Sequence, residues 1–308
     1  MQNLCTVYHA LCYWPKEGEH TVAIEGLKII GESINDSVPS TKKSFDANDI
    51  EGLKALAKMQ DEGGAAWIDV NVGLRDPEFM ARMVAEVQSV TAKPLSIDSP
   101  DFDLVAAGLR AYSQDRAGGR LPILNSISLM RTHMFDLYEE QPFMPLLLSC
   151  EREEDGVSRP NRTGAENYEA AKRLLRIARE HGIPNEHCIF DPGIAPIGSD
   201  TEGILAMVIE TLRSIHKDPD FAGVHASVGL SNFTVMLPPK RADGSPLKGP
   251  LESAFLTVAV PLGLDFVIGS VKRKYALLEP DDPAMLCVKD ILTLKGYDCV
   301  MRVMEYYS

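Results

Sequence analysis

Short apolar runs alternate with longer amphipathic segments along most of the chain. We predict β-strands at residues 27–31, 67–73, 94–98, 121–126, 143–150, 188–191, 222–232 and 264–270. Segments with helical periodicity separate these runs, among them residues 78–90, 102–112 and 165–181. Regular alternation of strand and helix requires crossover connections, and it therefore predicts a parallel sheet.

Strand–helix units in this number fit a closed barrel better than an open sheet. A (β/α)8 TIM barrel, the α/β fold predicted here, occupies about 250 residues as one domain, and this chain has 308. No Gly-rich dinucleotide fingerprint or phosphate-binding loop follows the first strand, which also favours the barrel. We expect residues 1–25 to form an extension packed on the barrel, and residues 26–308 to form the barrel with C-terminal helices.

The composition is that of an acidic globular protein. A formal charge of -13 argues against general nucleic-acid binding, which needs clustered Lys and Arg. The 6 cysteines show no CxxC spacing, which indicates free thiols in a reducing compartment. The N-terminus lacks the pattern of a signal peptide, and the most apolar window, residues 254–271, is interrupted by Pro261, Gly263 and Asp265. We therefore expect a cytoplasmic protein that binds neither nucleic acid nor a membrane.

Several predicted strands carry Asp or Asn side chains at or near their ends. The candidate site residues are Asp69, Asn71, Asp98, Asn125, Asp191 and, in the seventh strand, Gly229, Ser231 and Asn232. Any one of these positions by itself is typical of a helix cap or an Asx turn. The C-terminal ends of barrel strands meet at one face, however, and the pattern recurs there. We therefore interpret these residues as the lining of a single pocket.

This polar set suits ligand recognition better than metal chemistry. The sequence has no HxH pair, HExxH motif or Cys/His cluster at ligand spacing, so we expect no bound metal. No GxSxG nucleophile motif stands out, and His187 and His225 are interpreted as structural. A carboxylate accepts a pair of N–H groups, and an Asn amide serves a carbonyl and a ring N–H together. The set fits a flat heterocycle such as a pterin.

Six short motifs occur in order along the predicted barrel. They are Gly31-Glu32-Ser33-Ile34-Asn35, Asp69-Val70-Asn71-Val72-Gly73, Ile97-Asp98-Ser99, Asn125-Ser126, Asp191-Pro192 and Gly229-Leu230-Ser231-Asn232. Through these motifs the chain resembles the pterin-binding methyltransferases, which move a methyl group between methyltetrahydrofolate and a corrinoid protein and are related to dihydropteroate synthase. The resemblance implies methyltetrahydrofolate or tetrahydrofolate as substrate, cobalamin carried by a corrinoid protein partner, and a homodimer.

The resemblance also implies roles for individual residues. It places Asp98, Asn125 and Asp191 against the pterin ring, and it makes Asn232 the catalytic group that hydrogen-bonds the methyl-bearing N5. The remaining positions contact the folate or line its pocket: Gly229, Ser231, Asp69 and Asn71. We favour activation of N5 through an extended hydrogen-bond network. Asp98 or Asp191 as a discrete general acid is the alternative, and it would require a strongly raised pKa.

The loop at residues 237–250 is enlarged compared with the family. Its Lys240 and Arg241 would meet the glutamate carboxylates of folate, or they belong to an ordinary solvated basic loop. The function expected is methyl transfer in anaerobic one-carbon metabolism, such as O-demethylation, methylated-amine use or acetyl-CoA synthesis. One alternative is dihydropteroate synthase, although the related enzymes have a Lys where this chain has Asn232. Another is a non-catalytic folate-binding barrel, which needs no group at N5.

Overall fold

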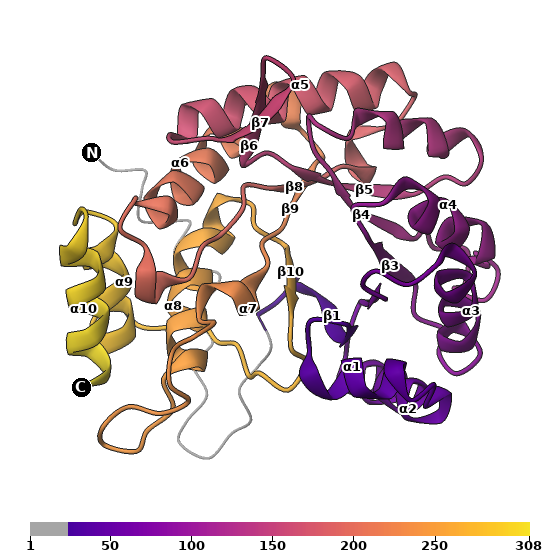
Figure 1. Cartoon of the computed structure of the whole chain (residues 1–308). Helices are drawn as coiled ribbons and strands as arrows, with labels where there is room; N and C mark the ends of the chain where they lie inside the picture. The colour runs from indigo at the N-terminus through magenta and orange to yellow at the C-terminus, as the bar shows by residue number, and fades with distance from the viewer. Residues whose placement is uncertain (1–23) are drawn as a thin grey trace.

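The computed structural model describes residues 24–308, which form a parallel β-barrel surrounded by helices (Figure 1). In sheet order the strands are β10 (Phe266–Gly269), β1 (Lys28–Asn35), β2 (Trp67–Asn71), β3 (Leu95–Asp98), β4 (Ile123–Ile127), β5 (Met144–Leu148), β8 (Ile189–Asp191) and β9 (His225–Ala226). Parallel bridges from Ala226 to Leu264 and from Gly229 to Ile268 join the β9 and β10 segments and close the barrel. The predicted (β/α)8 TIM barrel is confirmed. The extension predicted at residues 1–25 lies, up to residue 23, outside the described residues.

Helices cover the outside of the barrel. They are α1 (Pro39–Asp46), α2 (Ile50–Glu62), α3 (Pro77–Gln88), α4 (Phe102–Ala111), α5 (Gly164–Glu180), α6 (Ile204–Lys217), α8 (Lys248–Ala259), α9 (Pro283–Ile291) and α10 (Tyr297–Tyr307). The short connection η1 (Thr132–Glu139) is 3₁₀-helical. Side chains fix several helix starts: Asp76 caps α3, Asp101 caps α4, and Thr163 with Glu166 forms a capping box on α5. None of the helices between residues 24 and 308 has the length and apolarity needed to cross a bilayer.

Two segments differ from the predicted pattern. The strand expected at residues 222–232 is short, and it gives way to the one-turn helix α7 (Leu230–Phe233). Leu230 and Phe233 are both fully buried, because helical spacing puts them on one face and an extended backbone would not. The charged link at residues 151–164 contains an antiparallel hairpin, β6 (Glu151–Glu154) and β7 (Val157–Pro160). Its turn residues Asp155 and Gly156 both have positive φ, as the Asp-Gly pair in a tight hairpin requires.

The barrel interior has an apolar half and a polar half. Near the N-terminal strand ends a buried apolar cluster fills the barrel, formed by Ile30, Ile123, Met144, Leu146, Ile189 and Phe266. Two positions further along β1, β4 and β8, the same face carries Glu32, Asn125 and Asp191 instead, and Asp69 on β2 and Asp98 on β3 lie at the same end of their strands. We call this set the polar layer: Glu32, Asp69, Asp98, Asn125 and Asp191. The apolar half therefore forms a closed floor beneath the candidate site.

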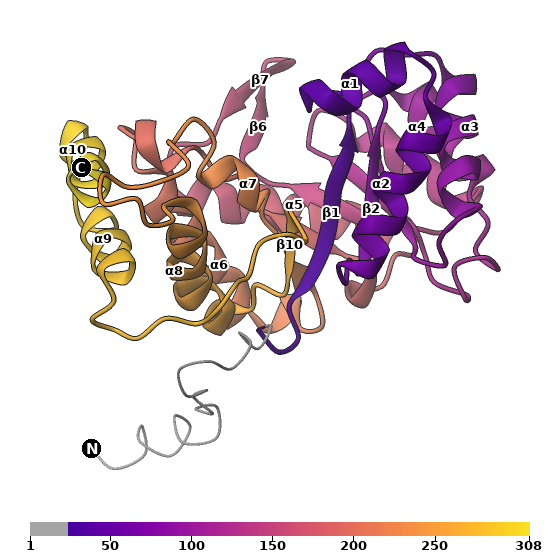
Figure 2. The ribbon, with the colours of Figure 1, turned by 90° about the horizontal axis from the view of Figure 1, so that it is seen from below.

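The C-terminal strand ends open at one end of the molecule. In Figure 2 the arrowhead of β1, helices α1 and α7 and the β6–β7 hairpin all lie at that end. These elements surround the mouth of the barrel above the polar layer. At the side of the barrel, the tail helix α9 packs on α8, and α10 packs on α9.

Replacing Phe266 by Ala should strongly destabilise the protein. The Phe266 side chain is fully buried and packs on Trp67, with ring centroids 5.3 Å apart. Loss of such a ring leaves a cavity in the floor and costs about 3–5 kcal/mol. Chemical denaturation followed by circular dichroism would show a lowered midpoint for Phe266→Ala. The control is Leu74→Ala, at a fully exposed position, which should leave the midpoint unchanged.

Candidate functional site

Four of the predicted site residues lie in one hydrogen-bonded network across β2, β3 and β4. The Nδ2 of Asn71 donates to Oδ2 of Asp98 at 2.9 Å, and the Nδ2 of Asn125 donates to Oδ1 of Asp69 at 3.3 Å. The hydroxyl of Ser96 also donates to Oδ1 of Asp69, at 2.6 Å. Adjacent strands place these side chains together, since Asp98 pairs with Asn125 in the register of β3 and β4. The structure brings these four residues together, and their role as the lining of one ligand pocket stays a prediction.

The network fixes which atoms the two Asn amides can offer to a ligand. Asn71 uses both ends of its amide, because its Oδ1 accepts the Gly73 N–H at 2.9 Å. Asn125 uses only its Nδ2. Within residues 24–308 no donor contacts the side-chain carbonyl oxygen of Asn125, Oδ1, so this atom is available as an acceptor.

The buried Asp69 and the half-buried Asp98 form a pair of carboxyl groups. Desolvation raises the pKa of Asp69 well above its ordinary value, and the neighbouring Asp98 raises it further. Desolvation also raises the pKa of Asp98, against the lowering effect of its hydrogen bond from Asn71. The buried Oδ2 of Asp69 has no hydrogen-bond partner within residues 24–308. Two neighbouring negative charges in a buried site are unfavourable, so the pair retains a proton more readily than isolated carboxyl groups do.

Asp191 approaches the same end of the barrel from β8. It is 5% exposed, and its Oδ1 accepts the Gly193 N–H at 2.7 Å. Burial raises the pKa of Asp191 to about 7. Gly193 has φ +73, and a Cβ there would lie 2.5 Å from the Cβ of Cys150, so the turn after Asp191 needs glycine. The turn therefore holds Asp191 in place, and burial puts its pKa near neutral pH.

Residues 229–232 bring the helix α7 to the mouth of the barrel. Ser231 Oγ donates to Oε2 of Glu32 at 2.7 Å, which ties α7 to β1. Asn232 is exposed, and its Nδ2 would lie only 2.8 Å from a Cβ at position 229. Gly229 thus leaves room for the Asn232 amide to fold back over the backbone. Because Asn232 lies on a helical turn and not on a strand, its amide is less enclosed than the groups of the polar layer.

Sequence reasoning missed three charged residues around Ser231. Glu32 is largely buried, which raises its pKa, while Ser231 and Arg273 act to lower it. Arg273 lies after β10, and its Nε is 3.3 Å from Oε2 of the buried Glu252 on α8. Glu32 had a detectable signal: it stands two positions after Ile30, so an extended first strand would have placed it in the interior. Arg273 and Glu252 had none, because no periodicity relates a loop residue to a helix of the outer layer.

The remaining predicted residues lie elsewhere. Arg241 donates from Nε to the Tyr306 carbonyl at 2.9 Å, and its guanidinium lies 4.6 Å from the Tyr306 ring centroid on α10. Lys240 is exposed in the same loop. A contact of either residue with folate stays a prediction. His225 contacts Asp265 at 2.6 Å near the start of β9, at the end of the barrel opposite the mouth. Among residues 24–308, no group of three His, Cys, Asp or Glu is placed to hold a metal ion.

The mouth of the barrel can recognise a flat, hydrogen-bonding ring. Its acceptors are the carboxyl groups of Asp98 and Asp191 and the carbonyl oxygen of Asn125, and its floor is closed to water by apolar side chains. Asn232 adds an exposed amide on α7 at the same end of the barrel. A planar ligand with several N–H groups would meet the acceptors first, and Asn232 would lie at its outer face.

Comparison with known proteins agrees with this geometry. The family described as "Pterin binding enzyme" matches residues 32–269. A methylcorrinoid:tetrahydrofolate methyltransferase of Eubacterium limosum is 26% identical over 250 residues, which cover 78% of this chain and 83% of that protein. The structure resembles dihydropteroate synthase from Xanthomonas albilineans in complex with 7,8-dihydropteroate, with a TM-score of 0.53, 16% identity and coverage of 88% and 92% of the two chains. The same enzyme with 4-aminobenzoic acid gives a TM-score of 0.54 at 17% identity, over 87% and 90% of the chains.

At such low identity the dihydropteroate synthase structures establish the fold alone. The family match is broader, because it extends from Glu32 in β1 to Gly269 in β10 and so includes every strand of the barrel. It also includes the polar layer and residues 229–232. The chain belongs to the pterin binding enzyme family.

Proposed function

We propose that this protein transfers a methyl group between N5 of methyltetrahydrofolate and the cobalt of a corrinoid protein. The observation that carries the proposal is the exposed amide of Asn232 on α7, a helical turn that the Ser231–Glu32 hydrogen bond ties to the polar layer. The name of the Eubacterium limosum relative, a methylcorrinoid:tetrahydrofolate methyltransferase, supports the same reaction. The metabolic setting expected is anaerobic one-carbon metabolism in the cytoplasm.

In this proposal the polar layer holds the pterin ring. Asp98 and Asp191 accept N–H groups along one edge of the ring, and the Asn125 carbonyl oxygen accepts another. Ionised carboxylates make stronger hydrogen bonds to N–H donors than neutral acids do, so a bound ring favours their charged forms. Asp69 and Asn71 lie behind these groups and hold them in place.

Asn232 acts on the reacting atom. When the Co(I) centre of the partner attacks the methyl carbon, the electron pair of the C–N bond returns to N5, and the cobalt gains the methyl group. An amide N–H from Asn232 to N5 stabilises the charge that develops there, and a single donor of this kind contributes about 3 kcal/mol. A proton then reaches N5 through the hydrogen-bond network or from water. The reverse transfer uses the same contacts.

The surface of the mouth supports a protein partner. Leu74, after β2, and Met236, after α7, are among the most exposed apolar side chains of residues 24–308, at 104% and 87%. Both lie beside the C-terminal strand ends, where a corrinoid protein would have to present its cofactor to N5. We expect the enzyme to act as a homodimer, with Lys240 and Arg241 near the folate tail.

The alternatives make different demands on position 232. Dihydropteroate synthesis forms a C–N bond as pyrophosphate leaves, and it needs a cation near the leaving group, whereas Asn232 supplies a neutral amide. A non-catalytic folate-binding barrel would need the polar layer but no group at N5. Both alternatives predict no reaction with reduced cobalamin.

Methyl transfer can be measured with purified protein, methyltetrahydrofolate and cobalamin reduced to Co(I). We expect the Co(I) absorption to decay as methylcobalamin forms, and more rapidly with a corrinoid protein than with free cobalamin. Tetrahydrofolate binding is measured in parallel by calorimetry. Tight folate binding without any decay of Co(I) would contradict the proposed reaction and favour a folate-binding barrel.

Replacing Asn232 by Ala should slow methyl transfer much more than it weakens binding. Loss of a donor that acts mainly in the transition state lowers the rate constant by about 10²–10³. The dissociation constant of methyltetrahydrofolate should change by less than about tenfold. The comparison variant is Asn125→Ala, for which binding should weaken strongly because the residue faces the ring in both states. Equal losses of binding and rate in Asn232→Ala would mean that Asn232 only binds the substrate and does not stabilise the transition state.

Folate binding should strengthen as the pH rises through about 7, because of Asp191. In the empty protein burial raises the pKa of this carboxyl, whereas N–H donors of the ring stabilise the ionised form and lower it. Binding below this pH must therefore release a proton, and the dissociation constant falls with rising pH by up to about tenfold per unit. Calorimetry in buffers of different ionisation enthalpy would detect the proton. Asp191→Asn should bind more weakly and lose this part of the pH dependence; an unchanged pH profile in that variant would exclude Asp191 as its source.

A further inference from the structure

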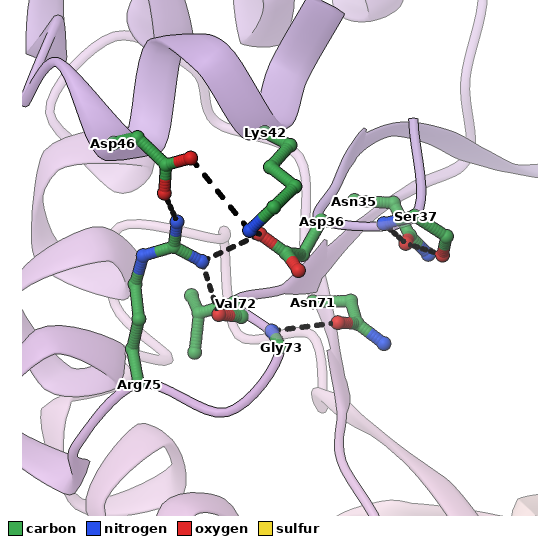
Figure 3. A network of polar contacts seen from close by, with 9 residues as sticks. All are labelled: Asn35, Asp36, Ser37, Lys42, Asp46, Asn71, Val72, Gly73 and Arg75. Carbon is green, nitrogen blue, oxygen red and sulfur yellow. Dashed lines mark hydrogen bonds and ion pairs between the residues drawn. The ribbon is translucent and has the colours of Figure 1, made fainter. Parts of the chain in front are cut away.

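A cluster of charged residues joins the loops that follow β1 and β2 (Figure 3). At its centre is Arg75, which is 18% exposed in its side chain. Its Nη1 donates to Oδ1 of Asp36 at 2.6 Å and to the carbonyl oxygen of Val72 at 2.7 Å, and its Nη2 pairs with Asp46 on α1. The guanidinium also lies over the rings of two aromatic residues, Phe45 at 4.8 Å and Phe79 at 5.4 Å. Arg75 therefore connects α1, the start of α3 and both loops.

The cluster fixes the backbone between β2 and α3. Arg75 binds the Val72 carbonyl, and Gly73 adopts φ +66. A Cβ on Gly73 would lie 2.6 Å from Oδ2 of Asp36, so the turn packs directly against the first loop. The N–H of Asp36 donates in turn to the Asn71 carbonyl at 3.0 Å. The turn is held from both sides.

This turn determines the orientation of the Asn71 side chain. The Gly73 N–H donates to Asn71 Oδ1 at 2.9 Å, as Figure 3 shows. The opposite amide orientation would set the Asn71 NH2 group against that N–H, donor against donor. With Oδ1 held by Gly73, Nδ2 points to Asp98 and donates to its Oδ2 at 2.9 Å. A continuous series of contacts thus runs from Arg75 through Gly73 and Asn71 to Asp98.

We propose that Arg75 is a positioning residue for pterin recognition, acting through Gly73 and Asn71 on Asp98. The inference rests on the proposed function only in taking the folate ring as the ligand of Asp98. Arg75 does not itself bind the substrate, because its donors already contact Asp36, Asp46 and the Val72 carbonyl. Its charge is also balanced, since two carboxylates surround it and Lys42 lies 3.6 Å from both.

The geometry explains why arginine is needed at this position. A guanidinium offers a planar set of donors that can reach three acceptors at once, whereas a lysine ammonium acts as a point charge on a flexible stem. The aromatic rings of Phe45 and Phe79 add stacking that keeps the plane fixed. Replacement by lysine would keep the charge and lose the simultaneous contact with both loops.

Arg75→Met tests the proposal, because methionine keeps much of the packing on Phe45 and Phe79 but removes all donors. We expect tetrahydrofolate, measured by calorimetry, to bind at least tenfold more weakly than to the wild type. Arg75→Lys should weaken tetrahydrofolate binding by most of the same factor. The matched control is Arg82→Met: Arg82 also lies over the Phe79 ring, at 4.9 Å, and contacts Asn48, but it does not reach the turn. Its affinity should remain within twofold of the wild type.

A double-mutant cycle with Asn71→Ala separates positioning from a general loss of structure. If Arg75 acts through Asn71, then Arg75→Met should weaken binding little further once Asn71 is already Ala. Additive losses, or wild-type affinity in either Arg75 variant, would overturn the inference. A wild-type protein that binds no tetrahydrofolate would overturn the proposed function, and this inference with it. Wild-type binding with an unaffected Arg75→Met would overturn the inference alone.

Discussion

The structure of the site depends on one unfavourable interaction, the burial of the Asp69 and Asp98 carboxyl groups side by side. Burial removes hydration from both carboxyl groups and raises the pKa of each, and the charge of Asp98 raises the pKa of Asp69 further. The surrounding side chains stabilise the carboxyl groups by donating hydrogen bonds to them. Ser96 and Asn125 donate to Asp69, and Asn71 donates to Asp98. These hydrogen bonds fix the orientation of both carboxyl groups before a ligand binds.

The fold tolerates this arrangement because an apolar layer lies directly beneath the polar layer. The floor formed by residues such as Ile30, Ile189 and Phe266 is fully buried and holds the strands at fixed separations. Side chains on strands of such a barrel have little freedom to move, so the acceptors of the polar layer are set before any ligand arrives. Outside the strands, the turn at residues 72–75 is also held in a fixed conformation, by its contacts with Arg75 and Asp36.

Asn232 contrasts with the groups below it. The acceptors on β3, β4 and β8 come from strands and are buried or half-buried, whereas Asn232 is exposed on a single helical turn. The Ser231–Glu32 hydrogen bond and the buried Leu230 and Phe233 hold that turn to the barrel, together with the Gly229–Ile268 bridge before it and the Thr234–Glu252 hydrogen bond after it. In the function proposed here the ring needs fixed acceptors, and the reacting atom needs a group that adjusts as charge develops. The division between strand residues and α7 provides both.

The sequence alone determined the barrel, because alternation of apolar runs and helical periodicity is a local property that requires a parallel sheet. It also determined that Asp69, Asn71, Asp98, Asn125 and Asp191 gather at one end, since each follows from strand position and a period of two. Tertiary structure alone decided the rest. The Ser231–Glu32 hydrogen bond joins residues 199 positions apart, and it exists because the barrel closes between β9, β10 and β1. Closure of the barrel also sets Arg273 beside Glu32 and Glu252. Residues 230–233 form a helix and do not continue the strand, because the helix buries both Leu230 and Phe233.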